Sequence, residues 1–232
     1  MFSLAGTSRL SQAKTLAPFA SPNELDADLL SFLEQTSSRL CRWLGEASVR
    51  GPLPSLTPLP HIGPSKSGVP LEGLLEELQL VMDGSYHPSH PGSLAHLDPP
   101  PLTASIAADL VCAGLNNNLL AEELSPSLSR LERSLCKWFA NCFSMPSSAG
   151  GVAVSGGSLA NLMALVVART FAGLQNDSEA IVIASSDAHV SLAKAIRVMG
   201  LSQNSLRIVP TDREGKMSLE ELEKLFKSLD IK

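Results

Sequence analysis

The sequence predicts an α/β protein with a helical front end. From residue 152 onward, short runs of β-forming residues alternate with stretches of helical periodicity, which is typical of a parallel or mostly parallel sheet covered by helices. Before residue 152, apolar residues recur at helical spacing between proline-rich connections. The chain has 232 residues, 44% of them hydrophobic, so it also has enough apolar material for a buried core.

Residues 1–23 are interpreted as a mobile N-terminal arm. They contain Arg9, Lys14 and several Ser and Ala residues, and the first acidic residue is Glu24. This bias is also typical of an organellar transit peptide, which stays open as the alternative. If residues 1–23 are a mobile arm and not a transit peptide, the protein is expected in the cytoplasm.

Four helices are expected before residue 152. Apolar residues at helical spacing place them at residues 23–44, 71–82, 102–116 and 126–143. Two irregular connections separate the first three helices. Residues 51–70 carry prolines too frequently for a helix or a central strand, and residues 84–101 are rich in Pro and His.

Three strands and three helices are expected in the remainder of the chain. Short β-forming runs predict strands at 152–155, 180–185 and 206–210. Helical periodicity predicts helices at about 159–172, 188–199 and 219–229. Asp187 is placed to cap the second of these helices. Ser218, with Glu221 three residues later, has the capping-box pattern at the start of the last one.

Composition argues against several partner classes. The formal net charge is -5 and there is no dense Lys/Arg block, so neither nucleic acid nor an anionic membrane is expected as a partner. The apolar run at 162–168 is far shorter than the ~20 residues that span a bilayer, and no transmembrane segment is expected. The four cysteines have no C-x-x-C spacing, so they are interpreted as buried free thiols in a reducing compartment. They are Cys41, Cys112, Cys136 and Cys142.

Two adjacent glycines mark a candidate anion site. Gly156 and Gly157 lie between an expected strand and an expected helix, where unpaired backbone N–H groups and the helix dipole favour negative charge. Such turns bind phosphate, and glycine lets a ligand approach the backbone closely. Ser158 can add a hydroxyl donor or cap the helix. A tight turn that holds no ligand remains the alternative.

Other phosphate and nucleophile motifs do not match this turn. The chain has no G-x-x-x-x-G-K-[ST] sequence, so a P-loop is excluded on pattern, and a Rossmann fingerprint also fails. The letters "VSGGS" lack the G-x-S-x-G of a nucleophile elbow, which disfavours a serine hydrolase. The phosphate therefore need not belong to a nucleotide.

His189 is the second candidate functional residue. It follows the expected strand at 180–185 and falls in the first turn of the next helix. At helical spacing it shares a face with Leu192, Ala193, Ile196 and Met199, so it is expected to head the buried stripe of that helix. Ligands of open α/β sheets bind outside the carboxyl ends of the strands, where the glycine turn is also expected. A histidine packed there for structural reasons remains the alternative.

At these residues the sequence resembles a family. The segments "GVAVSGGSLANLMALVVAR" and "SSDAHVSLAKA", with "HPGSLAHLDPPPLTASIAADL" upstream, resemble the group II pyridoxal-phosphate-dependent amino acid decarboxylases. That family includes glutamate, aromatic amino acid and diaminobutyrate decarboxylases, and the resemblance covers about residues 84–210 in the same order. It implies an incomplete large domain of the PLP-dependent transferase-like fold (aspartate aminotransferase fold type I) at 102–232. A helical and Pro-rich N-terminal segment at 24–101 is expected before it.

The resemblance also implies roles for the candidate residues. By position, Gly156, Gly157 and Ser158 correspond to the cup for the 5′-phosphate of pyridoxal 5′-phosphate, and His189 to the imidazole that stacks on the pyridine ring. Both roles agree with what the residues indicate by themselves. Leu159 departs from the family, because many relatives carry an acidic residue there. Since backbone donors hold the phosphate, this departure is expected to cost little affinity.

The histidine-rich connection is matched less closely. His96 and Pro99 correspond to the family's wall near the substrate. With His87 and His90 nearby, a metal site is conceivable, but the proline-rich setting gives no rigid ligand geometry, so no metal is expected.

The implied function is the pyridoxal-phosphate-dependent decarboxylation of an L-amino acid by a homodimer. The family needs a Schiff-base lysine and an aspartate against the pyridine nitrogen, both well downstream of the stacking histidine. Neither is identifiable up to Lys232, and Lys194 points off the buried face. The chain is therefore interpreted as an incomplete, inactive form of a decarboxylase. The alternative is a non-catalytic truncated relative that acts only by pairing with a full-length subunit.

Overall fold

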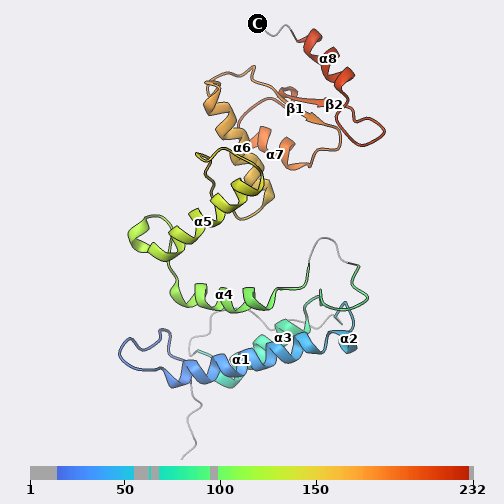
Figure 1. Ribbon diagram of the computed structural model, residues 1–232. Coiled ribbons are helices and arrows are strands. Elements are labelled where there is room, and N and C mark those ends of the chain that lie inside the picture. The colour runs from blue at the N-terminus through green and yellow to red at the C-terminus, as the bar shows by residue number, and fades with distance from the viewer. Residues whose placement is uncertain (1–14, 55–62, 64–67, 95–98, 230–232) are drawn as a thin grey trace, which may run out of the picture. The chain divides into compact units, whose positions relative to one another are not determined.

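The computed structural model describes residues 15–54, 63, 68–94 and 99–229, drawn in colour in Figure 1. The chain forms two compact units, Met1–Asn116 and Asn117–Lys232. Residues 1–14 of the expected N-terminal arm lie outside the described residues.

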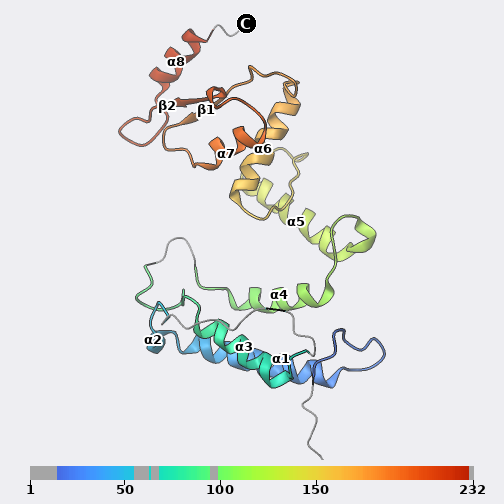
Figure 2. The same ribbon diagram turned by 180° about the vertical axis from the view of Figure 1, so that it is seen from behind.

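The first unit is built from helices. They are α1 (Ala27–Gly45), α2 (Ala47–Arg50), α3 (Leu71–Asp83) and α4 (Thr103–Leu115). Asp26 is the N-cap of α1, and its carboxylate accepts hydrogen bonds from the backbone N–H groups of Asp28 and Leu29. Helices α1 and α3 run side by side, as Figures 1 and 2 both show. Leu75 of α3 is fully buried against this contact.

An aromatic stack lies at the C-terminal end of α1. The rings of Trp43 and His87 lie 4.0 Å apart at an interplanar angle of 15°. The Nε2 atom of His87 also lies 2.9 Å from the carbonyl oxygen of Trp43, and His87 is only 2% exposed. His87 is therefore a core residue of the first unit.

The second unit combines a small sheet with helices. Its elements are η1 (Glu122–Leu124), α5 (Pro126–Cys142), α6 (Gly157–Phe171), β1 (Val182–Ser185), α7 (Ser191–Val198), η2 (Gln203–Ser205), β2 (Leu206–Val209) and α8 (Leu219–Ser228). Strands β1 and β2 pair in parallel, with Val182 opposite Leu206 and Ser185 opposite Val209. Helix α7 connects them and packs against α6, and its buried side is part of the core of this unit (Figure 1).

The expected helices are present with shifted ends. Helices α3 and α5 begin at the predicted residues, whereas α6 begins two residues earlier than expected, at Gly157. The short helix α2 is not predicted by the sequence. Ser218 caps α8 by accepting from the backbone N–H of Glu221, but the Glu221 carboxylate binds Lys224 instead of completing the capping box.

Three sequence predictions are wrong. Residues 152–155 are not a strand, because no described strand lies beside them, and the N–H of Ala153 instead donates to the Glu132 carboxylate. Asp187 does not cap a helix, since its carboxylate binds Ser186 and Thr211 and the helix starts later, at Ser191. The cysteines are free but not buried; three are exposed and Cys136 is half-buried. In the described part of the chain, no helix is both long and apolar enough to cross a bilayer.

Candidate functional site

The first turn of α6 offers unpaired backbone donors. Gly156 precedes the helix with extended backbone, and its carbonyl oxygen accepts from the N–H groups of Leu159 and Ala160. The N–H groups of Gly157 and Ser158 bond to no acceptor among the described residues, and no side chain caps this end. Because the helix dipole adds partial positive charge here, the turn is able to bind an anion.

The two glycines leave the turn open. A Cβ atom built on either Gly156 or Gly157 meets, apart from adjacent backbone, no heavy atom of the described residues within 4 Å. Neither residue has a backbone conformation reserved for glycine, because the φ of Gly156 is 165° and Gly157 is helical. Packing within the chain therefore does not require glycine at these positions. The open space fits a ligand that approaches the backbone closely.

His189 lies in the loop that joins β1 to α7. It is exposed and precedes the helix, so the prediction that it heads the buried stripe of α7 is wrong. The buried residues of α7 are Ser191, Ala195 and Ile196. The Nδ1 atom of His189 accepts from the backbone N–H of Ser191 at 3.2 Å. The imidazole thus satisfies one of the unpaired donors at the start of α7.

Asn161 connects α6 to this histidine. Its side-chain Nδ2 donates to the hydroxyl of Ser191 at 2.7 Å, and that hydroxyl lies 2.9 Å from His189 Nδ1. Asn161 is one helical turn beyond Gly157, a rise of about 6 Å. These hydrogen bonds link His189 to the helix that begins at the glycine turn, although no strand precedes that turn among the described residues. The sequence analysis missed Asn161 and Ser191 as parts of this region.

Polar contacts also join the loops at the carboxyl ends of the two strands. The hydroxyl of Ser186, directly after β1, lies 3.3 Å from the hydroxyl of Thr211, which follows β2. The Thr211 hydroxyl donates to the carboxylate of Asp187 at 3.3 Å. These contacts fix the start of the loop that carries His189.

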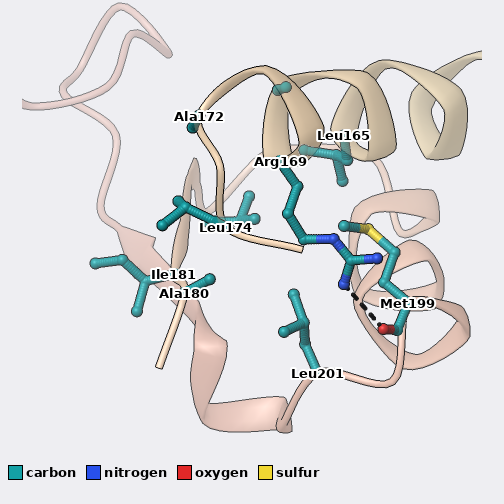
Figure 3. Close-up of a pocket in the computed structure, with 10 residues that line it drawn as sticks. Leu165, Arg169, Ala172, Leu174, Ala180, Ile181, Met199 and Leu201 are labelled. Carbon is teal, nitrogen blue, oxygen red and sulfur yellow. Dashed lines mark hydrogen bonds between the residues drawn. The ribbon is translucent and has the colours of Figure 1, made fainter. Parts of the chain in front are cut away.

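A separate cavity lies at the other end of α6. It has a volume of about 220 Å³ and is lined by the last turns of α6, the start of β1 and the residues after α7. Figure 3 shows the Arg169 side chain reaching toward Met199, whose carbonyl oxygen it binds at 3.1 Å. The lining is otherwise mostly apolar, with Leu165, Leu174 and Leu201 among its residues. None of the candidate site residues contributes to it.

The other candidate residues named from the sequence belong to the first unit or lie outside the described residues. His96 lies outside the described residues. Pro99 is exposed in the first unit, which is described separately. His87 is the core residue stacked on Trp43, and the Nδ1 of His90 accepts from the N–H of Gly92. In the described ranges, no three His, Cys, Asp or Glu side chains gather as a metal site would need.

None of the described lysines is buried. They are Lys137, Lys194, Lys216, Lys224 and Lys227, and all are exposed. The Lys224 ammonium donates hydrogen bonds to Glu220 and Glu221, and these raise the pKa of Lys224 above its usual range. Lys216 pairs with Glu214 at 2.6 Å. A lysine that attacks an aldehyde needs a neutral amine, which requires a lowered pKa. The environment of Lys224 favours the charged form.

Comparisons with known proteins match most of the chain. The family described as the pyridoxal-dependent decarboxylase conserved domain matches residues 65–232. The chain is 26% identical to an L-2,4-diaminobutyrate decarboxylase of Rhizobium meliloti, over 82% of this chain and 38% of the relative. It is 34% identical to an aromatic-L-amino-acid decarboxylase of Bacillus atrophaeus, over 61% of this chain and 29% of the relative. The chain thus spans less than half the length of these curated relatives.

Solved structures share the fold. The glutamate decarboxylase domain of a Vibrio parahaemolyticus protein matches with a TM-score of 0.81 at 22% identity, over 90% of this chain and 50% of that one. An Oryza sativa TDC structure with PLP and tryptamine matches with a TM-score of 0.78 at 23% identity, over 90% of this chain and 47% of that one. The predicted fold is confirmed: the chain has the architecture of about half of such a domain.

Proposed function

Because the chain belongs to the pyridoxal-dependent decarboxylase family, we propose that it supplies the phosphate-binding part of an enzyme that decarboxylates an L-amino acid. The cofactor is pyridoxal 5′-phosphate. One observation carries the proposal. The glycine turn is open and has unpaired donors, and it lies one helical turn from Asn161. The Asn161 side chain is hydrogen-bonded through Ser191 to His189. A phosphate and a flat ring attached to it match this pair of features.

The turn at Gly156, Gly157 and Ser158 holds the 5′-phosphate. The free N–H groups of Gly157 and Ser158 donate to phosphate oxygens, and the Ser158 hydroxyl adds a third donor. The dipole of the 15-residue helix α6 favours the negative charge. Leu159 is 40% exposed and presents no charge to the phosphate, so the departure from the family leaves the backbone donors intact.

His189 stacks on the pyridine ring. Its Nδ1 atom is bound by Ser191, which limits the rotation of the imidazole and leaves its faces available for a planar ring. When bound, pyridoxal 5′-phosphate supplies a ring that accepts the electrons left behind as CO₂ departs. The contribution of His189 is to orient that ring.

The lysine and the aspartate that complete the chemistry are assigned to residues outside those described. The described lysines are all exposed, which supports this assignment. The chain by itself is then inactive. The alternative is a non-catalytic relative that acts by pairing with a full-length subunit. Helix α4 buries none of its residues, so its apolar side chains are uncovered. These side chains support pairing with a second subunit in either case. We therefore include a homodimer in the proposal.

The cellular setting is proposed to be the cytoplasm. The described residues contain four free cysteines, a state that a reducing compartment maintains. Organellar targeting by residues 1–23 remains the alternative.

The experiment that tests the proposed function measures CO₂ release from a panel of L-amino acids. The transcript is first sequenced beyond the Lys232 codon, and the protein that it encodes is then assayed with and without pyridoxal 5′-phosphate. We expect release that depends on the cofactor from a continuous frame with a downstream lysine. A stop codon at this point with no release from any amino acid would support the non-catalytic alternative.

A further inference from the structure

Three side chains form a continuous hydrogen-bonded series between α6 and the loop before α7. Asn161 Nδ2 lies 2.7 Å from Ser191 Oγ, which lies 2.9 Å from His189 Nδ1. The backbone N–H of Ser191 points to the same Nδ1 atom at 3.2 Å. Ser191 is only 1% exposed, so water does not compete freely for its hydroxyl.

The direction of each hydrogen bond follows from the atoms involved. A backbone N–H can only donate, so His189 Nδ1 must accept and carries no proton. An amide NH₂ can also only donate, so the Ser191 hydroxyl accepts from Asn161. The proton of that hydroxyl is then free to donate to His189 Nδ1. In this arrangement His189 Nδ1 accepts from both the hydroxyl and the backbone N–H of Ser191.

We propose that Asn161 and Ser191 are positioning residues that hold the neutral ring of His189 in one tautomer, with its single ring proton on Nε2. A proton on Nδ1 would face the backbone N–H of Ser191, which can only donate, so that form is disfavoured. Nε2 makes no hydrogen bond with the described residues and remains available as a donor. The position of the ring proton does not depend on the proposed function. The role of that proton in orienting the cofactor ring does rest on the proposed function.

The placement of Asn161 supports this role. It lies inside α6, where asparagine is a poor helix former because its side chain competes for backbone hydrogen bonds. Here the side chain is directed to another element thirty residues away in the sequence. The pair thus fixes the loop at His189 to the helix that begins with the glycine turn.

The test is nitrogen NMR of the histidine rings in the protein labelled with ¹⁵N-histidine. Spectra are recorded at about pH 8, above the ordinary histidine pKa of about 6.5, so that a neutral ring is observed. The His189 signals are assigned by their loss in His189→Ala. We expect His189 with a protonated Nε2 and an unprotonated Nδ1. A His189 ring protonated on Nδ1, or one divided evenly between the two forms, would overturn the proposal.

A variant that reverses one hydrogen bond gives a second readout. In Asn161→Asp the carboxylate accepts from the Ser191 hydroxyl, which can then no longer donate to His189 Nδ1. We expect the proton population to move toward Nδ1, and Asn161→Ala, which leaves the Ser191 hydroxyl free to donate or accept, should shift it in the same direction by a smaller amount. Asn176→Asp, an exposed position in a loop, controls for the added charge and leaves the spectrum unchanged.

The outcomes separate this proposal from the proposed function. If Asn161→Asp folds, as judged by circular dichroism, and keeps the parent spectrum, the positioning role is overturned. If it does not fold, the parent spectrum decides the protonation pattern alone. Failure of the protein to bind pyridoxal 5′-phosphate while the Nε2 proton is retained would overturn the proposed function and leave the positioning of His189 standing.

Discussion

Asn161 donates a hydrogen bond of 2.7 Å to the hydroxyl of Ser191, thirty residues later in the sequence. This contact joins α6, which starts with the glycine turn, to the first residue of α7. Through Ser191 it reaches the imidazole of His189. The parts of the site proposed to bind the phosphate and the ring of one cofactor are therefore linked by a continuous series of hydrogen bonds.

Replacing His189 is expected to lower turnover while the fold persists. In the whole protein, His189→Ala loses the ring that orients the cofactor, and we expect turnover to fall roughly tenfold or more. His189→Phe keeps an aromatic ring without Nδ1, so it should retain more activity than the alanine variant. Steady-state kinetics with circular dichroism measure both effects. Normal turnover in His189→Ala would show that His189 does not orient the cofactor and only caps the start of α7.

The chain of 232 residues is expected to form no stoichiometric covalent adduct with pyridoxal 5′-phosphate. The described lysines are exposed, and acidic neighbours raise the pKa of Lys224, so its amine is charged at neutral pH. The measurement is borohydride reduction in the presence of the cofactor, followed by mass spectrometry of peptides. A complete adduct at one lysine, together with catalytic CO₂ release, would mean that a lysine within this chain performs the missing role.

Removing the cap of α8 is expected to destabilise the second unit. Ser218 accepts from the backbone N–H of Glu221, and Ser218→Ala leaves that donor unpaired. We expect a loss of about 1 kcal/mol in the free energy of unfolding, measured by urea denaturation. Ser178→Ala makes the same chemical change at an exposed loop position and should have little effect. Equal stability of Ser218→Ala and the parent protein would exclude a stabilising cap.

The ion pair between Glu122 of η1 and Arg133 of α5 predicts a dependence of stability on pH. Hydrogen bonds and charge from Arg133 lower the pKa of Glu122 below its usual range. A carboxylate with a lowered pKa adds stability above its unfolded pKa of about 4.3, and this is lost as the pH falls through the lower folded value. Glu122→Gln should thus be slightly less stable than the parent at pH 7, and the difference should vanish in acid. A difference that is the same at both pH values would contradict this assignment.

Local features of the fold were predictable, and those that join distant residues were not. The start of α3 at Leu71 and of α5 at Pro126 follows from periodicity and proline position, which are local signals. The strand expected at 152–155 fails because a strand needs a partner from elsewhere in the sequence. Periodicity alone also placed His189 inside a helix, although the contacts of Asp187 with Thr211 delay its start.

The same distinction applies to the site. The glycines and His189 could be found in the sequence because each residue type suits its expected place at a strand end. Asn161 and Ser191 carried no such signal, since an asparagine within a helix and a serine after a histidine are ordinary in isolation. Only the structure connects them, because it places Asn161 Nδ2 at 2.7 Å from Ser191 Oγ.

Equilibrium dialysis against pyridoxal 5′-phosphate tests the central claim most directly. The protein is compared with Gly157→Ala, which adds only a methyl group, and Gly157→Asp, which adds a carboxylate where the phosphate is expected. Since an added Cβ meets, apart from adjacent backbone, no atom of the described residues within 4 Å and an acidic residue suits the first turn of a helix, both variants should fold. We predict saturable binding by the parent protein, a modest loss in Gly157→Ala, and a loss of roughly tenfold or more in Gly157→Asp from like-charge repulsion. Unchanged affinity in Gly157→Asp, or no saturable binding by the parent protein, would contradict the account.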